Sequence, residues 1–118
     1  AVFGLQPIEP PKRDFEFLQE RVLQWADERD IIGMSTPTAQ AAKTLEELGE
    51  LFVALGSEAR EGGFDDIQDA YGDILVTLII GSYLADVDLV QALDSAYLTI
   101  RGRTGYINTA GIFVKEEA

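Results

Sequence analysis

The sequence contains no histidine and no cysteine. It therefore cannot supply a Ser-His-Asp triad, a thiolate nucleophile, or a zinc site built from the usual nitrogen and sulfur ligands. Any chemistry must depend on carboxylates, hydroxyls, amines and guanidinium groups. The metal ions that suit this set of ligands are hard, oxygen-seeking cations such as Mg²⁺ or Mn²⁺.

Positive charge is also scarce, because 9 Lys and Arg residues stand against 21 Asp and Glu residues, giving a formal net charge of -12. A protein that binds a phosphate backbone needs clustered cations, so we expect no nucleic acid partner. The longest apolar run, ILVTLIIGSYLA at 74–85, is too short to cross a bilayer, so we expect no membrane partner and a cytoplasmic location. Hydrophobic residues make up 47% of the chain, which indicates that the acidic groups sit on a folded frame.

The 118 residues are expected to form one folded domain with two extensions. All but one of the four prolines precede residue 13, which predicts an extended N-terminal arm over 1–13. A helical domain is expected over 14–104. The tail at 105–118 contains glycines and no helical period, which predicts a loop or a short extended segment.

Apolar residues in the middle of the chain recur at spacings of three and four, the period of an α-helix. Residue types that cap or end helices separate these segments, namely Asp or Glu, Ser, Thr, Pro and Gly. We expect Ser35 or Thr36 to be the N-cap of the second helix, before Pro37. We predict an all-α fold, an antiparallel bundle of about four helices, with helices over 15–30, 37–60, 65–85 and 88–101. Trp25 continues the apolar stripe of the first helix, which favours a core position over a platform that stacks a base.

Acidic residues form stripes on two of these helices. Lys43, Glu47 and Glu50 are separated by four and three residues, so they share one face of the second helix. Leu45, Leu48 and Phe52 form an apolar series on another face of this helix, which predicts that they pack in the core. By itself the charged stripe could simply be a solvated face opposite them.

The third helix carries a second acidic stripe, Asp66, Asp69 and Asp73, which leads into ILVTLII at 74–80. Because that segment is apolar on every side, we expect it to be buried on every side. Carboxylates next to an apolar wall and to one another must be protonated, paired with cations or bound to metal. Lys43 is the only basic residue between Arg29 and Arg60, so a bound metal ion best accounts for the charge.

The segment KTLEELGELFVAL at 43–55, followed by DAYGDILVTLI at 69–79, resembles the MazG-like all-α nucleoside triphosphate pyrophosphohydrolases. Their signature is ExxE on one helix and ExxD on the next; Glu47 and Glu50 match the first half, and Asp73 matches the final aspartate. The glutamate of the second half, three positions before that aspartate, falls on Ala70. The acidic residue nearest to this position is Asp69, which lies on the same helical face as Asp73. The tail, with GIFVKE at 111–116, is similar to the ending of short phage-type members.

This resemblance implies hydrolysis of a (deoxy)nucleoside triphosphate to the monophosphate and pyrophosphate with Mg²⁺ or Mn²⁺, in the cytoplasm of a phage-infected bacterial host. The implied metal ligands are Glu47, Glu50, Asp69 and Asp73, with Glu46 or Glu47 as the catalytic residue that orients the attacking water. The implied substrate-binding residues are Lys43, Arg103, Asn108 and Lys115, although Lys43 could equally pair with Glu47. The tail would lie over or near the active site of its own subunit or of a neighbour.

Other functions fit the same residues. The related all-α dUTPases share the carboxylate arrangement but select uracil, and a non-enzymatic helical assembly or metal-binding module would use the acid for solubility or ion binding alone. The sequence names no base. A lone four-helix unit would expose one side of 74–80, so we expect a homodimer or homotetramer.

Overall fold

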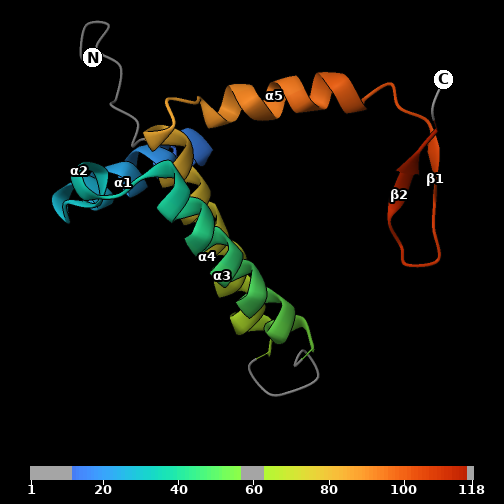
Figure 1. Cartoon of the computed structure of the whole chain (residues 1–118), viewed down its shortest axis with the longest axis horizontal. Coiled ribbons are helices and arrows are strands. Elements are labelled where there is room, and N and C mark those ends of the chain that lie inside the picture. The colour runs from blue at the N-terminus through green and yellow to red at the C-terminus, as the bar shows by residue number, and fades with distance from the viewer. Residues whose placement is uncertain (1–11, 57–62, 117–118) are drawn as a thin grey trace, which may run out of the picture.

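The computed structural model describes residues 12–56 and 63–116. These residues are mostly helical, which confirms the predicted class (Figure 1). The helices are α1 (Phe15–Glu28), α2 (Ile31–Met34), α3 (Pro37–Gly56), α4 (Gly63–Leu84) and α5 (Leu89–Ile100). Two short strands follow, β1 (Gly105–Ile107) and β2 (Phe113–Lys115). Of the predicted N-terminal arm, residues 1–11 lie outside the described part of the chain.

Side-chain caps fix where three helices begin. Asp14, Thr36 and Asp88 each accept a hydrogen bond from the backbone N–H three residues later, at 2.9, 3.0 and 3.0 Å. Such caps satisfy an N–H group that has no partner within the helix. Thr36, rather than Ser35, therefore caps α3, and Pro37 occupies its first helical position as predicted.

Two aspartates in the left-handed backbone region follow helix ends. Asp30 (φ 62°) comes after α1, and Asp86 (φ 60°) comes after α4. Aspartate tolerates this conformation better than most residues do, because its short side chain can hydrogen-bond locally. After Asp30 the chain continues as α2, a single helical turn that the sequence pattern did not predict.

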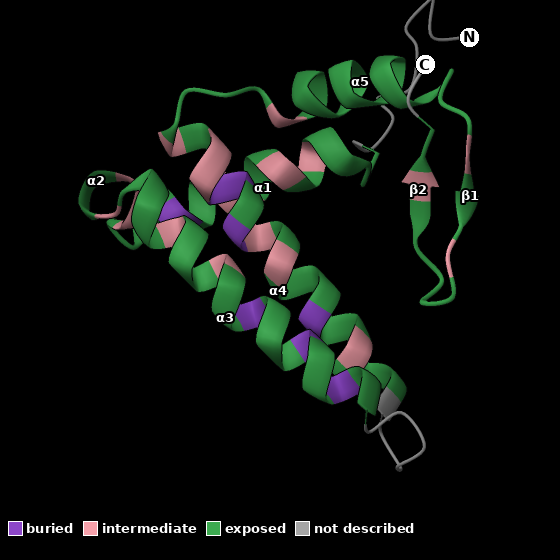
Figure 2. Ribbon diagram, turned by 45° about the vertical axis from the view of Figure 1, so that its right-hand side comes forward, coloured by how far each residue is buried: buried purple, intermediate pink, exposed green. Residues whose placement is uncertain are grey.

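Helices α3 and α4 lie side by side and carry most of the buried residues (Figure 2). A side chain at Gly81 would meet Gln40, and the Thr44 hydroxyl donates to the Thr77 hydroxyl at 2.8 Å. Further along, Glu50 lies beside Asp73. Residue numbers rise along one helix as they fall along the other, so the acidic stripes of the two helices meet.

The residues of α3 that face α4 are not the ones that the apolar pattern predicted. Leu45, Leu48 and Phe52 are 71%, 47% and 80% exposed, whereas Glu47 and Leu51 are buried, as is Ala54. The prediction that the former stripe is core is therefore wrong for a single chain. Small side chains at Ala54 on α3 and Ala70 on α4 occupy the contact between the helices, and the larger apolar residues of α3 lie on its outer side.

The apolar segment of α4 is also not buried on every side. Thr77, Ile79 and Ile80 are buried, but Leu75 and Leu78 remain 45% and 40% exposed. This is the open side that the sequence analysis expected of a lone unit.

The last part of the chain, Leu89–Glu116, is here called the C-terminal arm. In Figure 1, α5 runs away from the α3–α4 pair and the hairpin stands at its far end. The radius of gyration is 19.2 Å, against about 13.5 Å for a compact chain of this length. Packing of α5 into one bundle with the other helices is therefore not seen in the described residues.

The tail is non-helical and largely extended, as predicted, and its two extended segments pair as an antiparallel hairpin. Gly105, Tyr106 and Ile107 pair with Lys115, Val114 and Phe113. The Asn108 side-chain oxygen accepts hydrogen bonds from the backbone N–H groups of Ala110 and Ile112, both at 3.0 Å. Gly111, at φ 81°, completes the turn in a conformation that favours glycine.

None of the described helices combines the length and the apolar character that crossing a membrane requires.

Candidate metal centre

Three carboxylates meet where the acidic stripes of α3 and α4 face each other. Glu47, Glu50 and Asp73 each offer one oxygen, and these oxygens lie within 4.8 Å of one another. Two of the groups come from α3, one turn apart, and the third comes from α4. The pairing of the two helices therefore builds the group that the sequence predicted, with Asp69 as the one predicted ligand outside it.

Glu47 is the buried member of this group. Its side chain is 10% exposed, and its Oε2 atom is buried without a hydrogen-bond partner. A buried carboxylate oxygen that lacks a partner is costly, because it has lost its hydration and gained nothing in return. An oxygen-seeking cation at this position would satisfy it.

Lys43 holds the outer side of the group through two ion pairs. Its Nζ lies 3.2 Å from Glu46 Oε1 and 3.4 Å from Glu47 Oε1. The pairing between Lys43 and Glu47 that the sequence allowed is therefore present, and Glu46 joins it. Both carboxylates raise the pKa of Lys43, chiefly through the hydrogen bond to Glu46, so the lysine stays protonated.

One positive charge does not neutralise the group. The charge of Glu47, and a hydrogen bond with it, raise the pKa of the Glu50 carboxyl above its ordinary value of 4.5, and Lys43 opposes that shift only in part. A raised pKa means that the folded protein holds a proton at this position more tightly than an isolated glutamate does. A divalent cation competes for the same oxygens and removes the repulsion.

Asp69 lies beside this group rather than within it. It lines a hollow of about 280 Å³ together with Glu50, Asp66 and Asp73. Ala70, the position where the MazG-like signature has glutamate, is 5% exposed. Position 70 is therefore buried in the structure, while Asp69 is exposed at the rim.

The residues present fit a magnesium or manganese ion. All the available ligands are oxygens, which these ions prefer, and three carboxylates leave room for water or phosphate oxygens in a shell of six. Zinc sites of the usual type need nitrogen or sulfur ligands, which this chain lacks.

The predicted substrate-binding residues of the tail are placed elsewhere. Arg103, Asn108 and Lys115 belong to the C-terminal arm, and Figure 1 shows the hairpin standing apart from α3 and α4. The tail does not cover the acidic group of its own chain. The Asn108 side-chain oxygen is engaged in the hairpin turn.

A cavity adjoins the metal centre on the side of Lys43. It has a volume of about 610 Å³, and its mainly apolar wall comes from α1, α2, α3 and α4, including Trp25, Met34, Gln40, Lys43 and Thr77. Sequence reasoning missed this cavity, because α2 was not predicted and the residues come from four separate segments.

Trp25 is not a core residue, contrary to the sequence-based prediction. It is 44% exposed, and the Arg29 guanidinium lies 4.8 Å from its ring centre. Ala26 is the α1 residue that is fully buried, so the indole lies beside the helix contact rather than within it. The i,i+4 spacing of Trp25 and Arg29 was the available signal, since an arginine one turn away can stack on the ring.

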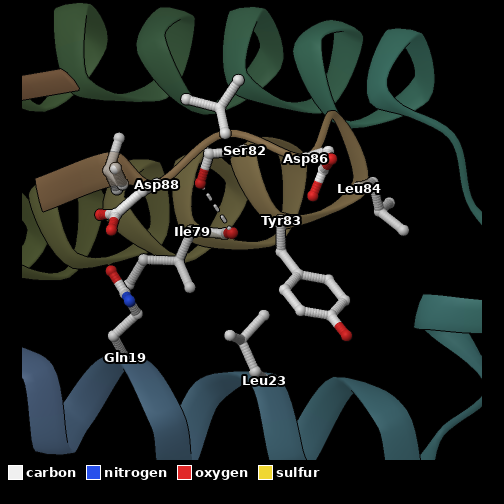
Figure 3. A pocket seen from close by; sticks show the side chains of 10 residues that line it. Gln19, Leu23, Ile79, Ser82, Tyr83, Leu84, Asp86 and Asp88 are labelled. Carbon is white, nitrogen blue, oxygen red and sulfur yellow. Dashed lines mark hydrogen bonds between the residues drawn. The ribbon is translucent and has the colours of Figure 1, made fainter. Parts of the chain in front are cut away.

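A second cavity of about 610 Å³ lies between α1 and the end of α4 (Figure 3). Gln19 and Leu23 line it from α1, and Tyr83 and Asp86 line it from the other side. The Ser82 hydroxyl donates to the Ile79 carbonyl at 3.0 Å beside it. This cavity does not include the acidic group and holds none of the predicted site residues.

No family model matches the chain. Over 77 residues, the chain is 32% identical to a protein described as an uncharacterized 18.2 kDa protein in the rep-hol intergenic region of Haemophilus phage HP1 (strain HP1c1). The match covers 65% of this chain and 45% of the phage protein, so the chain matches less than half the length of that relative.

Proposed function

We propose that this protein hydrolyses (deoxy)nucleoside triphosphates to the nucleoside monophosphate and pyrophosphate, with Mg²⁺ or Mn²⁺ as cofactor. The observation that carries this proposal is the group formed by Glu47, Glu50 and Asp73 around a buried carboxylate oxygen without a partner. A triphosphate is strongly anionic, and an acidic protein of net charge -12 needs divalent cations to hold it.

Glu47, Glu50 and Asp73 would hold the metal, and Asp69 at the rim would serve as an additional ligand. The ion would neutralise the phosphate oxygens and lower the pKa of a bound water. Burial of Glu47 between two helices fixes its position, so the ligands would be largely in place before a metal binds.

The remaining charged residues of α3 would act on the substrate. Glu46 is exposed, lies one residue from the metal ligands and is held by Lys43 at 3.2 Å. In the proposed reaction the attacking water bonds to the α-phosphorus while the bond to pyrophosphate breaks, and Glu46 accepts the proton that the water loses. Lys43 has three N–H donors, of which two point at Glu46 and Glu47, so one is available for a phosphate oxygen.

The cavity beside Lys43 would take the nucleoside. Its volume of about 610 Å³ lies in the usual range for small-molecule sites, and its mainly apolar wall with a few polar groups is typical of them. Trp25 supplies a half-exposed ring against which a base can stack. Gln40, whose side-chain amide donates to the Ser35 hydroxyl at 3.0 Å, supplies a polar group in the same wall.

We propose that, within the helical domain expected over 14–104, α1 to α4 act as an antiparallel bundle in which α3 and α4 hold the metal and α1 and α2 close the nucleoside cavity.

The direct test is to supply the common nucleoside and deoxynucleoside triphosphates with Mg²⁺ or Mn²⁺ and to measure pyrophosphate. We expect release from at least one triphosphate, loss of turnover in Glu50→Gln, and unchanged turnover in Glu20→Gln, which removes an exposed acid of α1. Cleavage of dUTP alone would favour the dUTPase-like alternative. Metal binding without cleavage of any triphosphate would show a metal-binding module instead and refute the proposal.

The cavity is tested separately. Trp25→Ala should raise KM more than it lowers kcat, because the ring contacts the base and not the phosphates. An unchanged KM would place the nucleoside elsewhere.

A further inference from the structure

The cavity between α1 and the end of α4 takes no part in the proposed reaction (Figure 3). Its volume of about 610 Å³ lies in the usual range for small-molecule sites. It shares no described lining residue with the cavity beside Trp25, and it contains none of the three grouped carboxylates. A ligand bound here would therefore be separate from the metal and the nucleoside.

The polar groups of this cavity are mainly hydrogen-bond acceptors. Asp86 and Asp88 line it from the segment that joins α4 to α5. The Ser82 hydroxyl donates its hydrogen to the Ile79 carbonyl at 3.0 Å, so toward a ligand it can only accept. Gln19 lines the wall formed by α1, and its Oε1 atom is buried without a hydrogen-bond partner. A ligand that matches this wall must therefore bring hydrogen-bond donors.

Gln19 and Asp88 are placed to share one donor. Figure 3 shows the Gln19 amide pointing from α1 toward Asp88. Asp88 caps α5 with Oδ1, which accepts from the backbone N–H of Gln91 at 3.0 Å and leaves the other oxygen for a ligand. A buried acceptor without a partner is costly, because it has lost its hydration. A donor that enters between Gln19 and Asp88 would satisfy both side chains.

The wall of this cavity is also negatively charged. Asp86 and Asp88 line it, and no lysine or arginine is among its described lining residues. The ion pairs of the described residues involve Arg29 and Lys43, and neither of these pairs with Asp86 or Asp88. Arg29 and Lys43 line the cavity beside Trp25 instead. A cation, rather than an anion such as phosphate, complements this wall.

The apolar part of the wall favours an organic cation over a metal ion. Leu23, Ile79 and Val87 lie among the polar groups, whereas magnesium and calcium prefer a shell of oxygens alone. Where the chain is described, a group of three or more carboxylates that could hold a metal occurs only at the centre formed by α3 and α4. The half-exposed Tyr83 ring, next to Leu23 in Figure 3, adds a face that attracts cations.

Backbone hydrogen bonds hold the two carboxylates in place. The N–H of Asp86 donates to the Tyr83 carbonyl at 3.0 Å, and the N–H of Val87 donates to the Ser82 carbonyl at 2.9 Å. Together with the Asp88 cap, these bonds fix the short segment between α4 and α5. Little further ordering is then needed when a ligand binds, which favours binding.

We propose that this cavity binds a primary alkylammonium ion, a cation with three N–H donors at one end and an alkyl chain behind them. The ammonium group donates to Gln19 Oε1 and to the carboxylates of Asp86 and Asp88. The alkyl chain lies against Leu23 and the Tyr83 ring. This inference does not rest on the proposed enzymatic function.

The first experiment titrates butylammonium chloride into the full chain, in chelator and at constant ionic strength, and follows the amide signals by NMR. We expect saturable shifts of the Gln19 side-chain amide and of the backbone amides of 82–89. Ammonium, which lacks the alkyl chain, and tetramethylammonium, which lacks N–H donors, should bind at least about five-fold more weakly. Equal affinity for the three ions, or a stronger response of these amides to Mg²⁺, would overturn the proposal.

Matched variants separate this cavity from general attraction to a chain of net charge -12. Gln19→Leu should weaken butylammonium binding about five-fold without lowering the melting temperature, because the buried oxygen has no hydrogen bond to lose. Asp86→Asn should weaken binding about three-fold. Asp94→Asn, which removes an exposed carboxylate of α5 outside the cavity, should leave binding unchanged. An equal loss in Asp94→Asn and Asp86→Asn, or unchanged binding in both cavity variants, would refute the assignment.

The same titration distinguishes two sources of the ammonium group. A free diamine and a lysine side chain of another protein both present it, so the probes are putrescine and a lysine blocked by acetyl and amide groups. The tighter binder identifies the source. If neither probe shifts the amides of the cavity, the proposal is wrong.

Discussion

Replacement of Glu47 by glutamine tests the metal centre most directly, because it removes one charge and keeps the shape of a buried side chain. In the absence of metal, the carboxylate is 10% exposed and lies within 4.8 Å of the carboxylates of Glu50 and Asp73. Glutamine removes this repulsion and gives up the ion pair with Lys43, which contributes little because the lysine side chain is exposed to solvent and its charge is screened. In chelator, we therefore expect the variant to melt at the same temperature as the unmodified protein or a few degrees higher.

When metal is bound, the unmodified protein should instead melt at a higher temperature than Glu47→Gln. A ligand present at a hundred times its dissociation constant stabilises a folded protein by about 2.7 kcal/mol. In a chain of 118 residues, 1 kcal/mol corresponds to about 4 °C, so saturating Mg²⁺ or Mn²⁺ should raise the melting temperature of the unmodified protein by roughly 11 °C. Glu47→Gln should gain much less, because the buried oxygen that needs a cation is gone.

The assay is a set of calorimetric or circular dichroism melts at one protein concentration, in chelator and in each metal. Glu20→Gln is the matched control, since Glu20 is exposed on α1 and outside the metal centre. It should respond to metal as the unmodified protein does. The reasoning fails if Glu47→Gln gains as much stability from metal as the control, or if no divalent ion shifts the unmodified protein.

Three further predictions test other parts of the structure. Glu47 raises the folded-state pKa of Glu50 above 4.5, so the folded state binds this proton more tightly than the unfolded state does. In chelator, the free energy of unfolding should therefore fall as the pH rises from 4.5 through the raised pKa of the folded state. Denaturant titrations should show a flatter pH profile for Glu50→Gln; an identical profile would contradict this. Thr77→Val removes a buried hydroxyl that accepts a hydrogen bond from the Thr44 hydroxyl at 2.8 Å. This change should lower the free energy of unfolding by about 1 kcal/mol, seen as a melting temperature roughly 4 °C lower. An unchanged melting temperature would mean that this contact does not hold α3 against α4. If the arm of one copy reaches the metal centre of the other, mixing inactive Glu50→Gln with a weakly active Lys115→Ala variant should raise activity above that of either alone, and activity that never exceeds the average of the two would place Lys115 outside that site.

The sequence by itself determined the helices and the residues that could bind metal. Helical periodicity and caps placed the four main helices to within a few residues, because those signals are local in the chain. The predicted helical residues 57–60 lie outside the described part of the chain. The acidic stripes containing Glu47, Glu50 and Asp73 could be identified for the same reason, since residues three and four apart share a face wherever the helix lies.

Tertiary structure decided which faces meet. The apolar pattern favoured Leu45, Leu48 and Phe52 as the inner face of α3, yet the face that carries Glu47, Leu51 and Ala54 packs on α4. Periodicity assigns side chains to faces, but it does not say which face a single chain buries and which it leaves for a partner. The cavity beside Trp25 likewise depends on four segments coming together. Its size, and the separation of the hairpin from the metal centre in one chain, follow from long-range packing that local sequence signals do not encode.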